Sequence, residues 1–289
     1  MDEELDLAFE RTGKRSEPSE SDLLHTSWQV PDFVITEYAP KTARYCIGIP
    51  VINEGDRIQT QLKTMHQLGL HQLADIVIAD GGSRDGSVSD ANLKPCHVRT
   101  LLTKTGSGKL SAQLRMFFAY ALTQGYEGVV IIDGNNKDGV DAIPAFLEAL
   151  SQGWDYVQGS RYIPGGIEEN TPLIRKLSVK LIHAPVISLG AGFRYTDTTN
   201  GFRALSRQFL IDERVQPFRH IFDTYNLHYY LSVMAPQLGY RVKEIPVSRR
   251  YPNAGPTPSK IKGLKTHWSM LMQLFRAALG GYRPTSHHR

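Results

Sequence analysis

The chain has 289 residues, of which 41% are hydrophobic and 21% are charged, a composition typical of a soluble globular protein with one large domain or two small ones. Its net charge is +4, and Glu244 is followed by eight Lys or Arg residues but no Asp or Glu, which indicates an anionic partner such as a phosphate-bearing substrate or a membrane surface. Nucleic acid is disfavoured as that partner, because no basic strand with aromatic residues and no zinc-ligand spacing accompanies the charge.

The cysteines and the hydropathy pattern predict a cytoplasmic protein. Cys46 and Cys96 fit no metal or redox spacing, so a reducing compartment is the simpler inference. No basic and then apolar signal opens the chain. The longest weakly polar run, residues 181–193, is interrupted by His183 and Pro185 and is too short to span a bilayer.

The distribution of polar residues divides the chain into three parts. Residues 1–27 are rich in Glu, Ser and Asp and are expected to form a polar, partly disordered tail. Residues 28–250 are expected to form one α/β domain. Residues 251–289 are expected to form a basic C-terminal segment with an amphipathic helix.

Within the α/β domain, apolar runs alternate with amphipathic segments. Strands are predicted at residues 45–51, 75–79, 98–102, 128–132, 156–158 and 241–247. Helices are predicted at residues 58–68, 111–124, 143–150 and 226–238. This alternation predicts a mostly parallel, doubly wound sheet with flanking helices.

The loop of residues 105–111 is similar to a phosphate-binding P-loop. That interpretation fails, because Thr103 stands where the first glycine is required and Leu110 where the magnesium-binding Ser or Thr is required. Lys109, at the start of the next predicted helix, can still meet a phosphate.

The predicted strand at 128–132 ends in a polar loop that contains Asp133, Asn135, Lys137 and Asp138. In open α/β sheets, ligands bind at the carboxyl ends of strands. Carboxylate and amide oxygens there suit Mg or Mn carrying a diphosphate. Taken alone, the loop is equally well interpreted as a polar turn that caps the next helix.

Six short motifs occur in one order along the chain. They are Ile-Pro-Val-Ile-Asn-Glu (49–54), Ala-Asp-Gly-Gly-Ser-Arg-Asp-Gly-Ser (79–87), Asp-Gly-Asn-Asn-Lys-Asp (133–138), Gly-Ser-Arg-Tyr (159–162), Asp-Thr-Thr-Asn-Gly-Phe-Arg (197–203) and Glu-Ile-Pro-Val (244–247). Together they resemble the family-2 glycosyltransferases, which have the nucleotide-sugar-binding GT-A fold. Within that family the chain most resembles the polyprenyl-phosphate sugar transferases exemplified by dolichol-phosphate mannose synthase. The resemblance spans residues 45–262 and includes Pro-Ser-Lys-Ile at 258–261.

The resemblance implies a pocket for a UDP- or GDP-linked sugar. Asp80 is expected to hydrogen-bond the base, since a carboxylate accepts from an N–H group of uracil or guanine and from ribose hydroxyls. Gly81 and Gly82 leave room for the backbone to approach the ligand. The implied donor-binding residues are Pro50, Asn53, Glu54, Asp80, Gly81, Gly82, Ser83, Lys109, Asp133 and Gly134.

The resemblance also implies a site for Mg or Mn. Asp133 corresponds to the first aspartate of the family's Asp-x-Asp motif, whereas Asn135 occupies the place of the second. An amide oxygen can ligate the metal but brings no charge, so either the metal affinity is lower or Asp138 supplies the second carboxylate. A metal-free variant with Lys137 as the counter-charge is a further alternative.

Arginines are the implied phosphate-binding groups, because a guanidinium donates bidentately to phosphate. Arg161, Arg175 and Ser178 are expected at the acceptor phosphate. Arg161 and Arg203 are also expected to take part in catalysis, beside the departing diphosphate. For any one of these arginines, a surface ion pair is the alternative.

The implied reaction is an inverting transfer of a hexose-type sugar to polyprenyl phosphate. A lipid phosphate is already ionised and needs no general base, whereas a hydroxyl acceptor needs a carboxylate such as Asp197 or Asp223. Asp197 can equally cap a turn.

Other functions stay open beside the lipid acceptor. One is transfer to a hydroxyl group of a saccharide or small molecule. The other is nucleotide-sugar binding without turnover, which stays open because Asn135 occupies the place of the family's second aspartate. A nucleotidyltransferase is disfavoured, because residues 51–55 lack the glycine-rich loop with Arg and Lys that such an enzyme carries after its first strand.

Residues 260–280 predict a basic amphipathic helix. Its apolar face holds Ile261, Leu264, Trp268, Leu271, Met272, Phe275 and Leu279, and Lys262, Lys265, Gln273 and Arg276 lie off that face. Such a helix is typical of contact with an anionic membrane, and equally of packing on the same domain or a second subunit. We expect a cytoplasmic protein that can bind peripherally at the inner face of a membrane.

Overall fold

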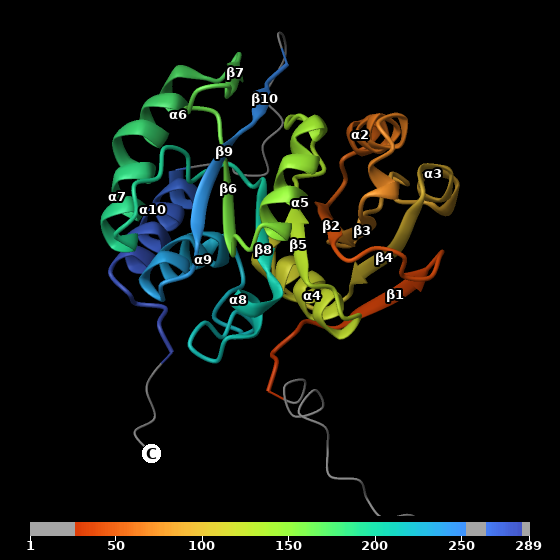
Figure 1. Cartoon of the computed structure of the whole chain (residues 1–289), viewed down its shortest axis with the longest axis horizontal. Coiled ribbons are helices and arrows are strands. Elements are labelled where there is room, and N and C mark those ends of the chain that lie inside the picture. The colour runs from red at the N-terminus through yellow and green to blue at the C-terminus, as the bar shows by residue number, and fades with distance from the viewer. Residues whose placement is uncertain (1–26, 253–263, 285–289) are drawn as a thin grey trace, which may run out of the picture.

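A computed structural model describes residues 27–252 and 264–284. Within these residues, an eight-stranded sheet crosses the molecule in the order β1-β4-β3-β2-β5-β8-β6-β9, with β1 and β9 at its two edges (Figure 1). The predicted tail, apart from Ser27, and the Pro-Ser-Lys-Ile motif at 258–261 lie outside the described residues.

Every strand predicted from the sequence is present, with ends that differ by one or two residues. The strands of the main sheet are β1 (Phe33–Glu37), β2 (Cys46–Val51), β3 (Asp75–Asp80), β4 (Val98–Lys104), β5 (Gly128–Ile131), β6 (Tyr156–Ser160), β8 (Arg203–Ser206) and β9 (Val242–Pro246). All residues of β3 and β5 are buried. Their apolar runs are continuous because helices cover both faces of the sheet.

The predicted helices are also present. They are α2 (Asp56–Gln67), α4 (Leu110–Thr123), α5 (Ile143–Ser151), α9 (Asn226–Gln237) and α10 (Leu264–Ala278). The structure adds helices that were not predicted, namely α3 (Asp90–Leu93), α6 (Leu173–Ser178), α7 (Ala184–Ala191) and α8 (Arg207–Ile211), and the short turns η1 (Leu70–Gln72), η2 (Lys94–Cys96), η3 (Val140–Ala142) and the π-helical η4 (Val179–His183). η4 joins α6 to α7, and Pro185 is tolerated because it lies in the first turn of α7.

The main sheet is mostly parallel, as predicted, but two of its strands are antiparallel to their neighbours. β1 runs antiparallel to β4, and β8 runs antiparallel between β5 and β6. Neither strand was predicted, because a strand of only four or five residues, some of them polar, shows little hydrophobic periodicity. Ile131 at the end of β5 lies opposite Arg203 at the start of β8, so the loop before β8 meets the loop after β5.

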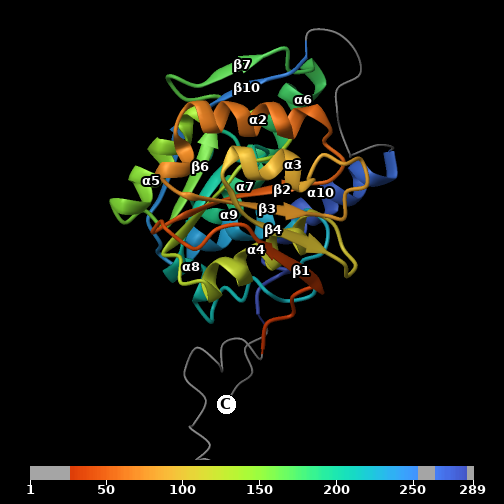
Figure 2. The ribbon, with the colours of Figure 1, turned by 90° about the vertical axis from the view of Figure 1, so that its right-hand side faces the viewer.

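Helices cover both faces of the main sheet, and each face has its own buried core. One core includes Ile58 and Leu62 of α2 and Phe146 of α5. The other includes Phe117 of α4 and Leu231 of α9. In Figure 2, α2 lies on one side of the strands β2, β3 and β4, and α4 lies on the other. The prediction of a doubly wound sheet is confirmed.

A second sheet of two parallel strands, β7 (Ile167–Glu169) and β10 (Ser248–Arg250), lies at the top of both Figure 1 and Figure 2. Its strand β10 is bonded to the loop after β5. Gly139 N donates to Ser248 O at 3.0 Å, and Arg250 N donates to Lys137 O at 2.8 Å. The second sheet therefore fixes the chain that follows Asp133.

Candidate active site

The loops after β2, β3 and β5 form one surface at the carboxyl edge of the main sheet. Gly81 N donates to Val51 O at 2.8 Å, and Gly134 N donates to Pro50 O at 3.3 Å. A Cβ atom on Gly134 would lie 2.8 Å from Val51 Cγ2, so glycine is required for this close approach. The predicted ligand-binding loops are thus in direct contact, as parallel neighbouring strands require.

Asp80 joins two of these loops. Asp80 is 1% exposed, and its carboxylate accepts from Ser83 N at 3.0 Å and from Ser83 Oγ at 2.6 Å. Ser83 Oγ in turn accepts from Asn53 N at 2.9 Å, and Asn53 Oδ1 accepts from Arg84 N at 2.8 Å. Asp80 therefore orders the loops after β2 and β3, and its contact with a nucleotide base stays a prediction.

Gln113 supports the same strand ends and was not predicted from the sequence. From the buried α4, its Nε2 donates to Val51 O and Ala79 O, both at 2.9 Å. A Cβ atom on Gly81 would lie 2.9 Å from that nitrogen, so Gly81 is needed where Gln113 lies beneath it. The one signal in the sequence is a polar residue between apolar neighbours in a helix.

The remaining predicted donor residues lie along the same edge. Glu54, at the start of α2, accepts from Arg57 Nη2 at 2.7 Å. Lys109 is exposed at the start of α4, and its backbone N donates to Asp223 O at 2.8 Å. Asp223 is half-buried there, next to Gly108, on which a Cβ atom would collide with the Asp223 carboxylate. The carboxyl ends of β2 to β5 thus bring together the residues predicted to bind the donor.

Asp133 follows β5 with its carboxylate partly open to solvent. The side chain is 24% exposed, and its Oδ2 lies 3.4 Å from Arg249 Nη2 and 3.3 Å from Asn135 Nδ2. Both distances are long for a hydrogen bond. A Cβ atom on Gly201 would lie 2.6 Å from Asp133 Oδ1, so the backbone of the loop before β8 packs against this carboxylate. Asp133 therefore keeps acceptor capacity for a cation.

Asp138 does not fit its predicted role as the second metal carboxylate. Its side chain is 0% exposed, and its Oδ2 accepts from Arg249 Nη1 at 2.5 Å. Burial raises the pKa of Asp138, and the charge of Arg249 opposes that rise. A metal would have to displace a buried guanidinium to reach this carboxylate, so we assign Asp138 to holding Arg249.

Arg161 and Asp197 form a buried ion pair, which argues against both predicted roles. Arg161 Nε lies 2.6 Å from Asp197 Oδ2, Arg161 Nη2 lies 3.0 Å from Asp197 Oδ1, and the side chains are 1% and 0% exposed. Thr199 N also donates to Asp197 Oδ1 at 3.2 Å. Because each group already has a bidentate partner, Asp197 is poorly placed to take a proton and Arg161 to bind a phosphate.

Arg203 is likewise internal. It is 2% exposed, and it donates to Asn200 O at 3.2 Å, to Thr198 O at 2.9 Å and to His228 O at 2.8 Å. These bonds join the loop before β8 to α9. This geometry argues for a positioning role instead of the predicted contact with the diphosphate.

Three cationic side chains surround Tyr251 beside Asp133. Lys137 Nζ, Arg175 Cζ and Arg249 Cζ lie 5.2, 5.7 and 5.8 Å from the centre of the Tyr251 ring, and we call these four residues the Tyr251 cluster. Arg175 Nη1 donates to Tyr251 Oη at 2.9 Å. Burial alone would raise the pKa of Tyr251, but the charges of Arg249 and Arg175 lower it overall.

Only two members of the Tyr251 cluster, Arg175 and Lys137, were considered as site residues from the sequence. Arg175 was predicted at the acceptor phosphate, and Ser178 follows it by three residues on α6, so the two share one side of that helix. Lys137 was considered as a counter-charge, and burial lowers its pKa. Arg249 and Tyr251 were not predicted, because β10 reaches the site only through its pairing with β7 and with the loop after β5.

Comparisons with known proteins identify the family of the chain. The profile described as Glycosyl transferase family 2 matches residues 46–213. Polyprenol monophosphomannose synthase from Mycolicibacterium smegmatis is 27% identical over 212 residues, which cover 72% of this chain and 77% of that protein. Undecaprenyl-phosphate mannosyltransferase from Micrococcus luteus is 27% identical over 180 residues, which cover 61% of this chain and 71% of that protein.

Among solved structures, the chain is similar to glucosyl-3-phosphoglycerate synthase from Mycobacterium tuberculosis in complex with Mn2+, uridine-diphosphate and glucosyl-3-phosphoglycerate. The TM-score is 0.58 at 14% sequence identity, and the match covers 95% of this chain and 88% of that chain. At this identity the likeness shows the fold alone, and that fold is the GT-A fold that the motifs implied.

We expect Arg249→Ala to lower the free energy of unfolding by about 3–5 kcal/mol, because it leaves the Asp138 carboxylate buried without its partner. Urea unfolding followed by circular dichroism measures the change. Asp133→Asn is the matched control and should change the free energy by less than about 1 kcal/mol, since Asp133 is partly exposed and makes only a long contact with Arg249. A wild-type midpoint for Arg249→Ala would contradict the role of this ion pair.

Proposed function

Because this chain belongs to glycosyl transferase family 2, we propose that it transfers a hexose-type sugar from a nucleotide-sugar donor to polyprenyl phosphate, with inversion at the anomeric carbon. The supporting observation is the Tyr251 cluster, which gathers three cationic side chains, one of them Arg249, 3.4 Å from the partly open carboxylate of Asp133. A donor diphosphate and an acceptor phosphate both require positive charge at this point. The names of the two relatives above support the same class of acceptor.

In this proposal the nucleotide of the donor binds over the loops after β2 and β3. Asn53, Asp80 and Ser83 form its polar wall, and Gly81 and Gly82 bring the backbone close to it. A carboxylate has about four lone-pair sites, so Asp80 can accept from a base or ribose as well as from Ser83. UDP and GDP both offer such donors, and either nucleotide satisfies these residues.

The residues at the end of β5 fit Mg or Mn. A hard divalent cation keeps water and substrate oxygens as ligands, so one or two protein groups are enough. Asp133 would hold the cation, because the long contacts of 3.3 and 3.4 Å at its Oδ2 leave this carboxylate available. Asn135 would have to turn its amide to add an oxygen, since its Nδ2 faces Asp133 and its Oδ1 accepts from Lys137 N at 3.2 Å. When bound, the cation supplies positive charge to the departing diphosphate.

The acceptor phosphate binds at Arg175 and Ser178 in this proposal. Guanidinium has five N–H donors, and the bond to Tyr251 uses one of them. An ionised phosphate oxygen attacks the anomeric carbon without losing a proton, so the reaction needs no general base. The burial of Asp197 in its ion pair with Arg161 agrees with such an acceptor.

A hydroxyl acceptor is the second candidate, and the position of Asp223 supports it. Asp223 is half-buried at the same edge of the sheet, next to Gly108 and the start of α4. A carboxylate at this edge can accept the proton of an attacking hydroxyl group. If the chain transfers sugar to neither a lipid phosphate nor a hydroxyl group, its remaining function is to bind a nucleotide sugar without turnover.

An apolar surface on α6, η4, α7 and α10 is the proposed contact with the lipid bilayer that carries such an acceptor. We call it the outer apolar surface. Its exposed residues are Leu173, Ile174, Leu177, Leu181, Ile182, Leu189, Trp268, Met272, Phe275 and Leu279. Arg175, Lys176 and Lys180 lie among them, and basic residues beside apolar ones favour an anionic membrane surface.

The helix α10 differs from the simple amphipathic helix expected there. Leu274 and Ala277 are buried where α10 packs on α7 and α9, whereas Trp268 and Leu279 are 68% and 85% exposed. Its apolar residues are therefore divided between internal packing and the outer apolar surface. No helix in the described ranges is long and apolar enough to cross a membrane.

Asp133→Asn is expected to lower the rate of transfer about 100-fold or more, because a formal charge is lost beside the departing diphosphate. Asn135→Asp is expected to strengthen Mn binding by adding a second carboxylate. Asp138→Asn should lower stability and leave the Mn dependence unchanged. Transfer to polyprenyl phosphate over a range of Mn concentrations, with circular dichroism to confirm folding, measures all three. Near-normal turnover and an unchanged Mn dependence for Asp133→Asn would contradict this proposal.

Arg175→Ala is expected to raise KM for polyprenyl phosphate about tenfold or more while nucleotide affinity stays unchanged, because a charge-assisted bond to the acceptor alone is lost. Steady-state kinetics and calorimetry with UDP and GDP measure the two quantities. Arg250→Ala is the matched control, since Arg250 is an exposed arginine that pairs with Glu169. An equal rise of KM in both variants would remove Arg175 from the acceptor site.

Ile174→Ser combined with Leu189→Ser is expected to weaken sedimentation with anionic liposomes about tenfold or more, because two large apolar side chains no longer leave water on binding. Donor binding should not change, since these residues lie away from the nucleotide loops. Leu73→Ser is the control, since Leu73 is 51% exposed and does not belong to the outer apolar surface. Absence of liposome binding by the unmodified protein would show that the membrane contact is wrong.

A further inference from the structure

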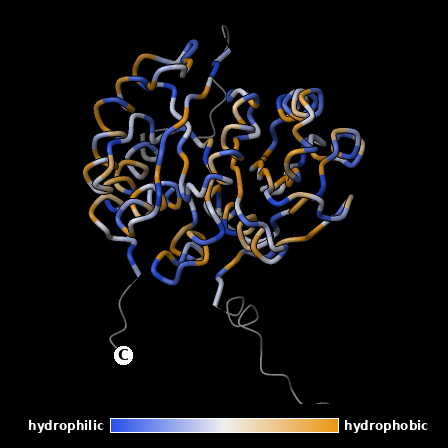
Figure 3. Tube along the Cα trace, in the orientation of Figure 1, coloured by the Kyte–Doolittle hydropathy of each residue, from blue (hydrophilic) through white to orange (hydrophobic). Residues whose placement is uncertain are grey.

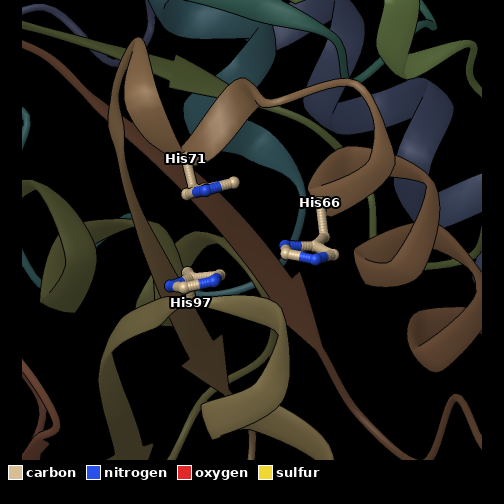
Figure 4. Close-up of side chains that lie close together, drawn as sticks. All are labelled: His66, His71 and His97. Carbon is tan, nitrogen blue, oxygen red and sulfur yellow. The ribbon is translucent and has the colours of Figure 1, made fainter.

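Three histidines form a cluster at the amino ends of the strands of the main sheet, opposite to the candidate active site at the carboxyl ends. His66 lies in the last turn of α2, His71 in η1, and His97 between η2 and β4 (Figure 4). The helix α2 starts at the carboxyl end of β2 and runs back, and His97 directly precedes β4. The cluster therefore lies at the amino ends of the strands, where neither the donor nor the acceptor is proposed to bind.

The three rings are close enough to share one ion. Their centroids lie 4.3 Å apart for His71 and His97, 5.0 Å for His66 and His97, and 5.1 Å for His66 and His71. One nitrogen from each ring lies within 4.8 Å of the others. The rings are stacked with interplanar angles of 8–25°, and tetrahedral Zn2+ holds imidazole nitrogens about 3.3 Å apart, so the exposed His66 and His97 side chains must rotate out of the stack to bind one ion together with His71.

The three rings keep nitrogen atoms that an ion could bind. In the described ranges, no hydrogen bond or ion pair joins these rings to a carboxylate, and His71 Nδ1 is buried without a hydrogen-bond partner. His97 has a φ of 56°, an uncommon backbone conformation for a residue with a side chain.

We propose that His66, His71 and His97 bind one divalent transition-metal ion of the Zn2+ class, with water completing the coordination. Imidazole nitrogens suit Zn2+, Ni2+, Co2+ or Cu2+ and not the hard Mg2+ that carboxylates prefer. The site is chemically distinct from Asp133 and does not depend on the proposed function. It joins the end of α2, η1 and the start of β4, so the bound ion stabilises the folded chain.

The test compares the full chain with the triple variant His66→Gln/His71→Gln/His97→Asn. Asn is chosen at position 97 because it tolerates positive φ. Calorimetric titration with Zn2+ in excess Mg2+, which competes for carboxylate sites such as Asp133, is expected to show one site whose Kd rises at least 100-fold in the variant. Saturating Zn2+ is expected to raise the melting temperature of the wild type by about 5 °C and that of the variant by none.

Co2+ provides a second measurement, because tetrahedral Co2+ has strong visible absorption bands, which we expect in the wild type and not in the triple variant. His220→Gln is the matched control, an exposed histidine outside the cluster that should leave Zn2+ binding unchanged. If the triple variant does not fold, His66→Gln alone is expected to weaken binding at least tenfold.

Either of two results would overturn the assignment. One is equal Zn2+ affinity in the wild type and the triple variant, which would place the ion elsewhere, for example at His287 and His288 outside the described residues. The other is a wild-type melting temperature that Zn2+ does not raise, which would leave the three rings as a stacked surface cluster.

Discussion

The buried ion pair between Arg249 and Asp138 is the interaction on which the candidate site depends. It joins β10 to the loop after β5, and the same guanidinium reaches Asp133 at 3.4 Å. Two buried charges are costly to remove from water, so such a pair contributes little net stability but penalises any arrangement that separates it. Asp133 is thereby held at the carboxyl edge of the sheet, and its carboxylate keeps acceptor capacity for a cation.

The antiparallel strand β8 explains why several charged residues of the sequence motifs lie inside the protein. β8 starts where β5 ends, so the loop before it must pack under the site, and its charged groups need buried partners. Asp197 pairs with Arg161, and Arg203 donates to three carbonyl oxygens. These residues position the site's backbone, whereas Asp133 and Arg175 stay partly exposed.

The helix α6 connects the proposed acceptor site with the proposed lipid contact. Leu173 and Ile174 are 69% and 81% exposed on it, while Arg175, the next residue, donates to Tyr251 beside Asp133. A lipid whose chain lies along the outer apolar surface would therefore carry its phosphate to the cationic cluster. The histidine cluster lies at the opposite edge of the sheet, so a metal there can stabilise the fold without entering the reaction.

The sequence by itself determined six of the eight strands of the main sheet, the long helices and the residues at the carboxyl ends of β2, β3 and β5, because continuous apolar runs and helical spacing are local properties that burial on both faces imposes. It also placed Asp133 at this edge, since a polar loop directly after a buried strand reaches it. Only the tertiary structure decided which charged residues are available to ligands. Asp138, Arg161 and Asp197 are occupied by partners distant in sequence, and Arg203 reaches α9 at His228. Gln113 joins the site from α4, and Arg249 and Tyr251 join it from β10 and the residue after it, through packing that no local pattern records.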